Sequence, residues 1–369
     1  MTALRGWRGR RVLVTGHTGF KGSWLSLWLA EAGADVTGLA LPASTEPSLF
    51  EAARIGEIVD HRIADVRDMA AVQSVFADAR PEVVFHLAAQ PLVRLSYQQP
   101  VETYATNIMG TAHVLEAARQ AGTVEAIVCV TSDKCYDNRE WAWAYRESDP
   151  LGGHDPYSSS KGCAELVAAA YRSSYLDVAP APERWTGLAT ARAGNVIGGG
   201  DWAEDRLIPD VLRALSNGDR PLIRAPKAVR PWQHVLEALH GYILVAERLL
   251  AGERRFAQGW NFGPFEDDMQ AVETIVDHLV AAWGGKGWGI APGDHPHEAA
   301  MLRLDSSKAR AELGWRPVLG LTEALNWIML WHQAFAAGED ARGLTLDQIR
   351  IYAAMSQSHP TASVSKAVA

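Results

Sequence analysis

The segment Thr15-Gly16-His17-Thr18-Gly19-Phe20-Lys21-Gly22 separates an apolar run at Arg11–Thr15 from a helical pattern that extends to Ala32. Its three glycines let the backbone turn tightly and approach a pyrophosphate. The N-terminus of the helix then presents unpaired N–H groups and the positive end of its dipole to that anion. Because strand, turn and helix follow one another in this order, a dinucleotide-binding loop is favoured over an ordinary glycine-rich turn. The expected cofactor contacts in this loop are Gly16, Thr18, Gly19, Phe20 and Gly22.

The first half of the chain alternates short apolar runs with helical patterns. The expected strands are Arg11–Thr15, Asp35–Ala40, Val83–Leu87, Ala126–Thr131 and Leu188–Ala193, and the expected helices between them are Gly19–Ala32, Met69–Ala79 and Thr103–Ala121. Several of the strands are continuously apolar, as expected of parallel strands that are buried on both faces. The alternation predicts an α/β fold with a doubly wound, parallel, Rossmann-type sheet.

The pattern changes after Asn195, where a glycine triplet at 198–200 and several prolines interrupt the chain. We expect residues 1–194 to form the dinucleotide-binding domain, joined by segments that return from about 225–262. A smaller α/β substrate lobe is expected mostly within 195–354. Residues 355–369 are small or polar and aperiodic, which predicts a flexible tail.

Composition limits the classes of partner. The 369 residues carry a formal net charge of -8, so the chain is a poor general binder of nucleic acid, and local groups must meet any anionic ligand. The three cysteines have no zinc-type spacing and indicate a reducing compartment. Neither a signal peptide nor a membrane-spanning apolar run is visible, so we expect a cytoplasmic protein with no membrane partner.

Residues beyond the loop refine the expected cofactor site. Asp65, followed by Val66, could accept the adenine amino group, while Leu87-Ala88-Ala89 ends a strand at the sheet edge where such folds bind ligands. The acidic residue that usually grips the adenosine ribose is missing, because Leu39-Ala40-Leu41 stands near that point. Only Lys21 could reach a 2′-phosphate, so NAD is favoured over NADP.

Tyr157 and Lys161 lie four residues apart at the head of an expected helix, Tyr157–Ser174, and therefore share a face. A lysine ammonium beside a phenol should lower the pKa of the tyrosine and make it a base for a sugar hydroxyl. Ser132 ends a preceding strand, where it could bond a substrate oxygen, and Asp133 and Lys134 follow directly. The alternative interpretation of this last segment is a solvated ion-pair turn.

These motifs resemble the extended short-chain dehydrogenases and, within them, the nucleotide-sugar 4,6-dehydratases. The resemblance extends over about Arg10 to Glu339 and is strongest to the CDP-glucose branch. It rests on the glycine loop and on the segments Gln90–Arg94, Thr131–Asn138 and Gly198–Trp202.

The resemblance implies that NAD is the cofactor, that Ser132, Tyr157 and Lys161 form a catalytic triad, and that Asn107 supports it. Asn107, Tyr157 and Lys161 are also expected to contact the cofactor. It places Lys134 where related enzymes carry a glutamate base, so Lys134 would act in its neutral form, beside Asp133 as a neutral acid. The expected substrate contacts are Gln90, Arg94, Asn195, Arg206, Arg230 and Asn261. Among these, Arg230 is the first candidate for the diphosphate, which a guanidinium pairs bidentately. Arg206 could instead be a plain surface cation, and Asn261 could mainly fix a loop.

The implied reaction is dehydration of CDP-glucose to CDP-4-keto-6-deoxyglucose, in a homo-oligomer (dimer or tetramer). The nearest alternatives are another nucleotide-sugar 4,6-dehydratase or a 4-epimerase, and an alternative of a different class is a non-catalytic dinucleotide-sensing regulator. His295, His297 and Glu298 lack the spacing of a metal site, so we expect no metal.

Overall fold

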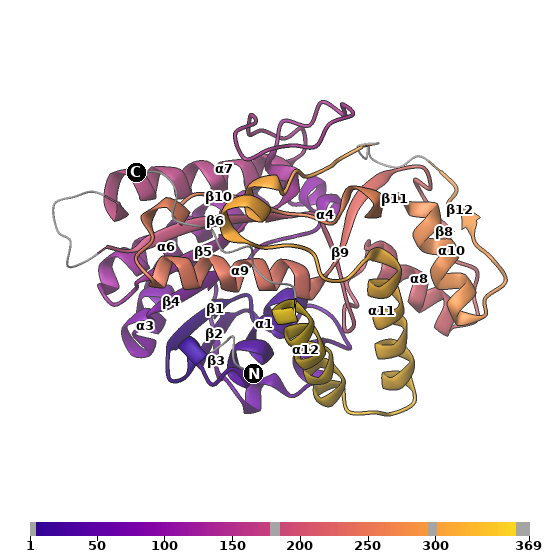
Figure 1. Cartoon of the computed structure of the whole chain (residues 1–369), viewed down its shortest axis with the longest axis horizontal. Coiled ribbons are helices and arrows are strands. Elements are labelled where there is room, and N and C mark those ends of the chain that lie inside the picture. The colour runs from indigo at the N-terminus through magenta and orange to yellow at the C-terminus, as the bar shows by residue number, and fades with distance from the viewer. Residues whose placement is uncertain (1–4, 178–184, 294–300, 359–369) are drawn as a thin grey trace.

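The computed structural model describes residues 5–177, 185–293 and 301–358. At its centre is a seven-stranded parallel sheet in the order β10-β6-β5-β4-β1-β2-β3 (Figure 1). Its strands are β1 Arg11–Thr15, β2 Asp35–Ala40, β3 Asp60–Ile63, β4 Val83–His86, β5 Ala126–Val130, β6 Gly187–Ala193 and β10 Gly259–Phe262. The predicted doubly wound Rossmann-type sheet is confirmed, and the five expected strands lie within one residue of their predicted bounds.

Helices cover both faces of the sheet. One face packs against α1 Phe20–Glu31, α9 Val235–Leu250 and α12 Ala341–Ser358, and the other against α3 Met69–Ala79, α6 Gly110–Ala121 and α7 Pro156–Tyr171. Successive residues of a strand point to opposite faces of the sheet. In β1, Val12 and Val14 pack in the core on the first face, and Leu13 packs in the core on the second. The expected helix Thr103–Ala121 is formed by α5 Pro100–Tyr104, a π-turn Ala105–Met109 and α6 in succession.

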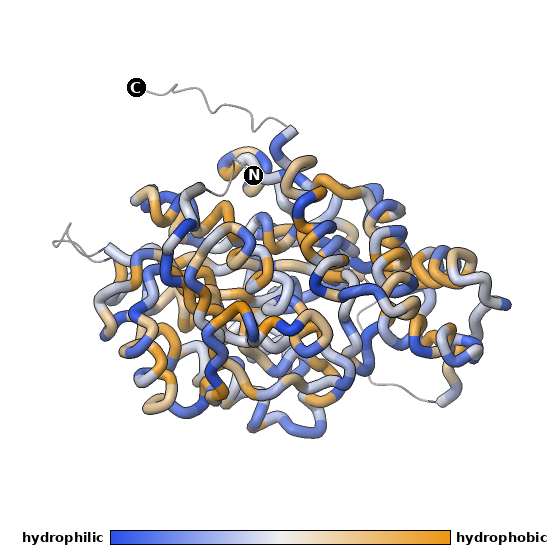
Figure 2. Tube along the Cα trace, turned by 90° about the horizontal axis from the view of Figure 1, so that it is seen from below, coloured by the Kyte–Doolittle hydropathy of each residue, from blue (hydrophilic) through white to orange (hydrophobic). Residues whose placement is uncertain are grey.

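The remaining segments build a smaller lobe. It holds a three-stranded sheet of β7 Asn195–Ile197, β9 Val229–His234 and β11 Met269–Ala271, and the short pair β8 Leu222–Ile223 and β12 Gly289–Ile290. Helices α8 Leu207–Ser216, α10 Val272–Trp283 and α11 Leu321–Ala336 enclose a separate apolar core. Figure 2 shows hydrophobic and hydrophilic stretches alternating along the helices, as expected where one face of each is buried.

The C-terminal segment departs from prediction. Helix α12 continues through Ser358, so a flexible tail beginning at residue 355 is wrong for residues 355–358. The buried Ile349 and Tyr352 anchor this helix in the core beside α1 and α9, rather than in the lobe. Residues 359–369 lie outside the described residues. Within the described ranges, no helix is both long and apolar enough to cross a bilayer.

Candidate active site

The glycine loop between β1 and α1 has the shape of a phosphate cradle. Gly16 has a φ of 75°, and a Cβ there would lie 2.8 Å from the Ala88 nitrogen. At Gly22 a Cβ would lie 2.1 Å from the Gly16 carbonyl oxygen, so only glycine allows the helix to start this close to the strand. At Gly19 the nearest atom would be 3.4 Å away, so this side of the loop is open to a ligand. The N-cap residue of α1 is Gly19, which has no side chain to bond the first turn. The loop therefore fits a pyrophosphate.

The end of β4 completes this cradle. Thr15 Oγ1 accepts hydrogen bonds from the backbone N–H groups of Leu87 and Ala88, both at 3.1 Å. Asn107 is buried in the π-turn before α6, and its side chain bonds both backbone groups of Gln90 and donates to Ser160 Oγ at 2.8 Å. Asn107 thus ties the β4 edge to helix α7, which carries Tyr157.

Lys21, in the first turn of α1, was the candidate for contact with a 2′-phosphate. Its ammonium lies 5.9 Å from the ring centre of Tyr242 and lines the catalytic cleft. Burial lowers its pKa to about 7, and the charges of Lys161 and Arg206 act in the same direction. The idea that Lys21 could reach a 2′-phosphate is therefore wrong, because its side chain points toward the catalytic end.

Asp65 and Val66 follow β3 at the same sheet edge. Asp65 Oδ2 accepts from Arg67 Nη2 at 2.6 Å, so a bound adenine would share this carboxylate with Arg67. Val66 is buried, and its carbonyl oxygen lies 2.9 Å from His113 Nδ1. Near the end of β2, Thr18 Oγ1 donates to the Leu41 carbonyl at 2.9 Å, which fixes the loop against Leu39–Leu41.

A single cleft of about 440 Å³ runs from the carboxyl ends of β5 and β6 into the smaller lobe. Its deep end is lined by the buried Ser132, Asp133 and Tyr157 together with Lys134. Apolar residues of α8 and β8 and several cationic side chains line other parts of it. The cleft therefore offers a ligand acid and base groups, positive charge and apolar surface.

Asp133 is the most unusual group at the deep end. It is 3% exposed, and its Oδ1 accepts from Ser132 Oγ at 2.9 Å. Within the described part of the chain, its buried Oδ2 has no hydrogen-bond partner. Burial raises the pKa of this carboxyl, although the nearby Lys134 opposes the shift. A raised pKa favours the protonated carboxyl, so this side chain is suited to donate a proton from its unbonded oxygen in the cleft.

Tyr157 and Lys161 both sit on α7 but are not paired as predicted. Burial raises the pKa of Tyr157 to about 12, and Ser132 and Arg206 only partly oppose this. Lys161 Nζ instead donates to the Val130 carbonyl at 3.4 Å. The expected lowering of the tyrosine pKa by Lys161 is wrong for the protein alone, because the cost of burying a phenolate outweighs the neighbouring charges.

Four arginines line the cleft: Arg94, Arg206, Arg224 and Arg230. Arg206 donates to the buried Asp201 at 2.9 Å, so it is not a plain surface cation. Arg230 is 8% exposed and lies close enough to Asp133 to lower the pKa of that carboxyl. Asp205 accepts from both Arg94 and Arg224 at 2.9 Å, and these bonds join α4 Val93–Gln98 to the lobe.

Of the other expected substrate contacts, Asn195 lines the cleft, whereas Gln90 and Asn261 do not. Gln90 donates to Thr103 Oγ1 and to the Leu92 carbonyl, and it is not among the cleft-lining residues. Asn261 is fully buried, where it accepts from Tyr136 and donates to the Tyr145 carbonyl. Asn261 therefore fixes loops, the first of the two roles considered for it, and does not reach the cleft.

Sequence reasoning missed Asp201 and Asp205, whose carboxylates hold the arginines of the cleft. The glycine triplet at 198–200 was the available signal, because it marks the start of this loop. His295, His297 and Glu298, considered for a metal, lie outside the described residues. The described residues contain no cluster of three potential metal-ligating side chains.

A family model described as GDP-mannose 4,6 dehydratase matches residues 13–327. The chain belongs to this family. It is 58% identical over 335 residues to a CDP-glucose 4,6-dehydratase from Salmonella typhimurium, covering 90% of this chain and 93% of that one. It is 30% identical over 328 residues to a dTDP-glucose 4,6-dehydratase from Streptomyces griseus, covering 87% and 93%.

A solved structure extends the comparison to three dimensions. The dTDP-glucose 4,6-dehydratase from Streptomyces venezuelae, with NAD and TYD bound, aligns with a TM-score of 0.75 and 26% identity. The alignment covers 90% of this chain and 99% of that one. A 29% identical relative from Mycolicibacterium smegmatis is named a UDP-glucose 4-epimerase, so the same scaffold also serves epimerases.

Proposed function

We propose that this chain is a CDP-glucose 4,6-dehydratase, which converts CDP-glucose to CDP-4-keto-6-deoxyglucose and water. The observation that carries the proposal is Asp133, a buried carboxyl with a raised pKa and an unbonded oxygen in the cleft. Loss of the C6 hydroxyl needs a proton donor, whereas 4-epimerisation needs none at that position. The 58% identical relative of that name supports the same substrate.

NAD fits the glycine loop, and when bound it supplies the acceptor for hydride from C4 of the sugar and the donor that returns hydride to C6. Gly16, Gly19 and Gly22 would hold its pyrophosphate, with Thr18, Phe20 and the Leu87–Ala89 edge beside it. Leu39–Leu41 offers a 2′-phosphate no cation, and Lys21 points elsewhere, so NAD is favoured over NADP.

The catalytic steps are assigned to side chains at the deep end. Tyr157, with Ser132 beside its phenol, takes the proton from O4. The 4-ketone acidifies the C5 proton, which Lys134 accepts and gives back to C5 when hydride returns to C6. Asp133 gives its proton to the departing C6 hydroxyl, which leaves as water. Lys161 lies one helical turn beyond Tyr157, where it would contact the bound cofactor.

The nucleotide would bind in the rest of the cleft. Arg206 and Arg230 line it and would pair with the diphosphate, and Arg94 and Asn195 line it as well. The apolar side chains of α8 and β8 would enclose the base. A non-catalytic regulator would have no need of Tyr157, Lys161 and a neutral acid around one cleft.

A panel of nucleoside diphosphate hexoses tests this proposal. Incubated with the protein and NAD, only CDP-glucose should yield the 4-keto product in quantity, detected by its absorbance in alkali. Tyr157→Phe is the control for contaminating activity. A C4 epimer without any 4-keto product would establish the epimerase alternative instead.

Two further features complete the proposal. Exposed apolar side chains on α5 and α7, including Val101 at 75% and Leu166 at 60% exposure, support a homo-oligomer formed through these helices. If so, Leu166→Glu should lower the mass measured by analytical ultracentrifugation.

The three free cysteines support a reducing, cytoplasmic location.

A further inference from the structure

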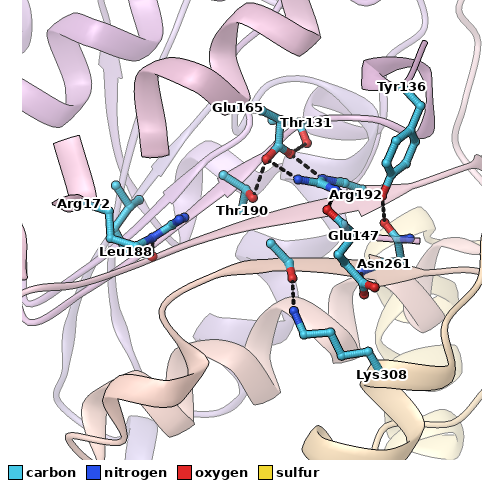
Figure 3. Close-up of polar contacts among 11 residues, drawn as sticks. Thr131, Tyr136, Glu147, Glu165, Arg172, Leu188, Thr190, Arg192, Asn261 and Lys308 are labelled. Carbon is cyan, nitrogen blue, oxygen red and sulfur yellow. Dashed lines mark hydrogen bonds and ion pairs between the residues drawn. The ribbon is translucent and has the colours of Figure 1, made fainter. Parts of the chain in front are cut away.

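A buried ion pair joins helix α7 to strand β6 (Figure 3). Glu165 on α7 and Arg192 on β6 make two bonds, from Nε to Oε1 at 2.9 Å and from Nη2 to Oε2 at 2.8 Å. Both side chains are about 95% buried, with 4% and 6% exposed. Burial acts to raise the pKa of Glu165, but the ion pair with Arg192 and the hydrogen bonds from Thr131 and Thr190 together outweigh it, so the pKa is lowered.

This pair contacts both flanks of the turn that carries Asp133. On one side, Thr131 Oγ1 donates to Glu165 Oε1 at 2.5 Å, and Thr131 directly precedes Ser132. On the other side, Arg192 Nη1 donates to the Tyr136 hydroxyl at 2.7 Å, and Tyr136 directly follows the 3₁₀ turn Asp133–Cys135. Figure 3 shows Thr131 beside Glu165 and Tyr136 close to Arg192.

Tyr136 lines the cleft, and the network continues from its hydroxyl. The Tyr136 hydroxyl donates to Asn261 Oδ1 at 2.7 Å, and Thr190 donates to Glu165 Oε2 at 2.7 Å. Neither Glu165 nor Arg192 lines the cleft, so neither touches a substrate. Burying two charges gives little net stability, because desolvation offsets their attraction. A fully bonded network of this kind does hold its neighbours in one geometry.

Tyr157 is held by different contacts. Its backbone N–H donates to Ser96 Oγ at 3.2 Å, and Asp155 caps the start of its helix through the Ser158 N–H at 2.9 Å. Asn107 holds the neighbouring Ser160. A change at Arg192 or Tyr136 should therefore disturb the turn that carries the acid more than it disturbs the base used in C4 oxidation.

We propose that the Glu165–Arg192 pair is a positioning device for the elimination step, acting through Thr131 and Tyr136 to hold Asp133 and Lys134 against C6 and C5 of the sugar. This inference rests on the proposed dehydratase function. Neither residue of the pair donates or accepts a proton in the reaction. The pair fixes the turn that carries Asp133 and Lys134, whereas C4 oxidation depends on Tyr157, which other contacts hold.

The mildest test is Tyr136→Phe, which keeps the ring and removes the hydroxyl between Arg192 and Asn261. In single-turnover mixing with NAD and CDP-glucose, elimination should slow at least tenfold, since a misplacement of about 1 Å can cost about 10²-fold in rate. Oxidation at C4 should change less than about threefold, so reduced cofactor and a 4-keto hexose with its C6 hydroxyl accumulate. Amide hydrogen exchange of residues 132–137 should also accelerate in the protein without ligand.

Tyr352→Phe is the matched control. Its hydroxyl is equally buried and donates to the Glu237 carboxylate at 2.6 Å, but it joins α12 to α9 and does not line the cleft. This variant should lose stability without changing the ratio of the two steps or the exchange of residues 132–137. Equal effects of the two substitutions on that ratio would overturn the proposal.

A second variant removes the pair itself. Glu165→Leu with Arg192→Met takes away both charges together, so neither is left buried alone. It should fold and show the same selective loss of elimination as Tyr136→Phe. If it does not fold, Tyr136→Phe decides the matter. Equal slowing of both steps, or no change in either, in Tyr136→Phe contradicts the positioning role. If the wild-type protein forms no 4-keto product from any hexose, the proposed function itself has failed.

Discussion

Replacing Asp133 by asparagine removes the acidic proton of the side chain but keeps its size and its hydrogen bond with Ser132. Asparagine keeps the size of the side chain, and its carbonyl oxygen can still accept the Ser132 hydroxyl proton now donated to Oδ1 at 2.9 Å. The position of Oδ2, which has no partner among the described residues, would be taken by an amide nitrogen. Only the proton donor is lost.

The expected effect on rate follows from that loss. Removing a general acid typically costs about 10²- to 10⁴-fold, which corresponds to about 3 to 5 kcal/mol of transition-state stabilisation. The rate of elimination should fall, whereas the rate of C4 oxidation should not, because Tyr157 and its contacts remain. Rapid mixing should show reduced cofactor forming at nearly the wild-type rate and persisting, and mass spectrometry should find a 4-keto hexose that keeps its C6 hydroxyl.

Stability should respond in the opposite direction. Burial raises the pKa of Asp133 in the folded protein, so the folded state disfavours the ionised carboxyl. At pH values below the unfolded pKa of about 3.9 this has no cost, and the cost grows as the pH rises through the folded pKa. Asp133→Asn should therefore raise the melting temperature at neutral pH, with a gain that shrinks as the pH falls. Near-wild-type turnover, or a lower melting temperature at neutral pH, would refute this account of Asp133.

Three other substitutions test neighbouring roles. Tyr157→Phe should lower the rate of C4 oxidation by about 10²- to 10⁴-fold and abolish the rise of kcat/KM with pH that ionisation of this phenol produces, which a pH–rate profile measures; a retained profile would place the base elsewhere. Lys134→Ala should stop exchange of the C5 proton with deuterated solvent, read by NMR, and wild-type exchange would exclude this lysine as the base. Gly22→Ala places a Cβ 2.1 Å from the Gly16 carbonyl oxygen and should weaken NAD binding at least tenfold in calorimetry, whereas Gly6→Ala, with no atom within 4 Å of its Cβ, should leave binding unchanged.

The sequence was sufficient for the centre of the fold because its strands are apolar on both faces. β3 Asp60–Ile63 escaped prediction since it is a mostly exposed edge strand with the polar sequence Asp-His-Arg-Ile. Segments from about 225–262 were expected to return to the first domain, but the strand β10 Gly259–Phe262 and its pairing with β6 across about 70 residues of chain were not identified. Helix α12 escaped because only one side of it, with Ile349 and Tyr352, is buried.

The site was predictable where residue type and spacing decide the chemistry, as in the glycine loop and at Ser132, Asp133 and Tyr157. It was not predictable where three-dimensional burial decides. The direction of Lys21, the raised pKa of Tyr157 and the bonding of Asn261 all depend on neighbours from distant segments. The Glu165–Arg192 pair joins a helix and a strand in the same way, so its residues carry no local motif.

The fate of hydrogen at C4 tests the central claim most directly. CDP-glucose deuterated at C4 should be incubated with the protein and NAD, and the product examined by NMR and mass spectrometry. Transient oxidation at C4 with return to C6 predicts one deuterium at C6 of CDP-4-keto-6-deoxyglucose and no net reduction of the cofactor. Deuterium retained at C4 of an epimer, or reduced cofactor formed in proportion to product, would contradict the dehydratase assignment.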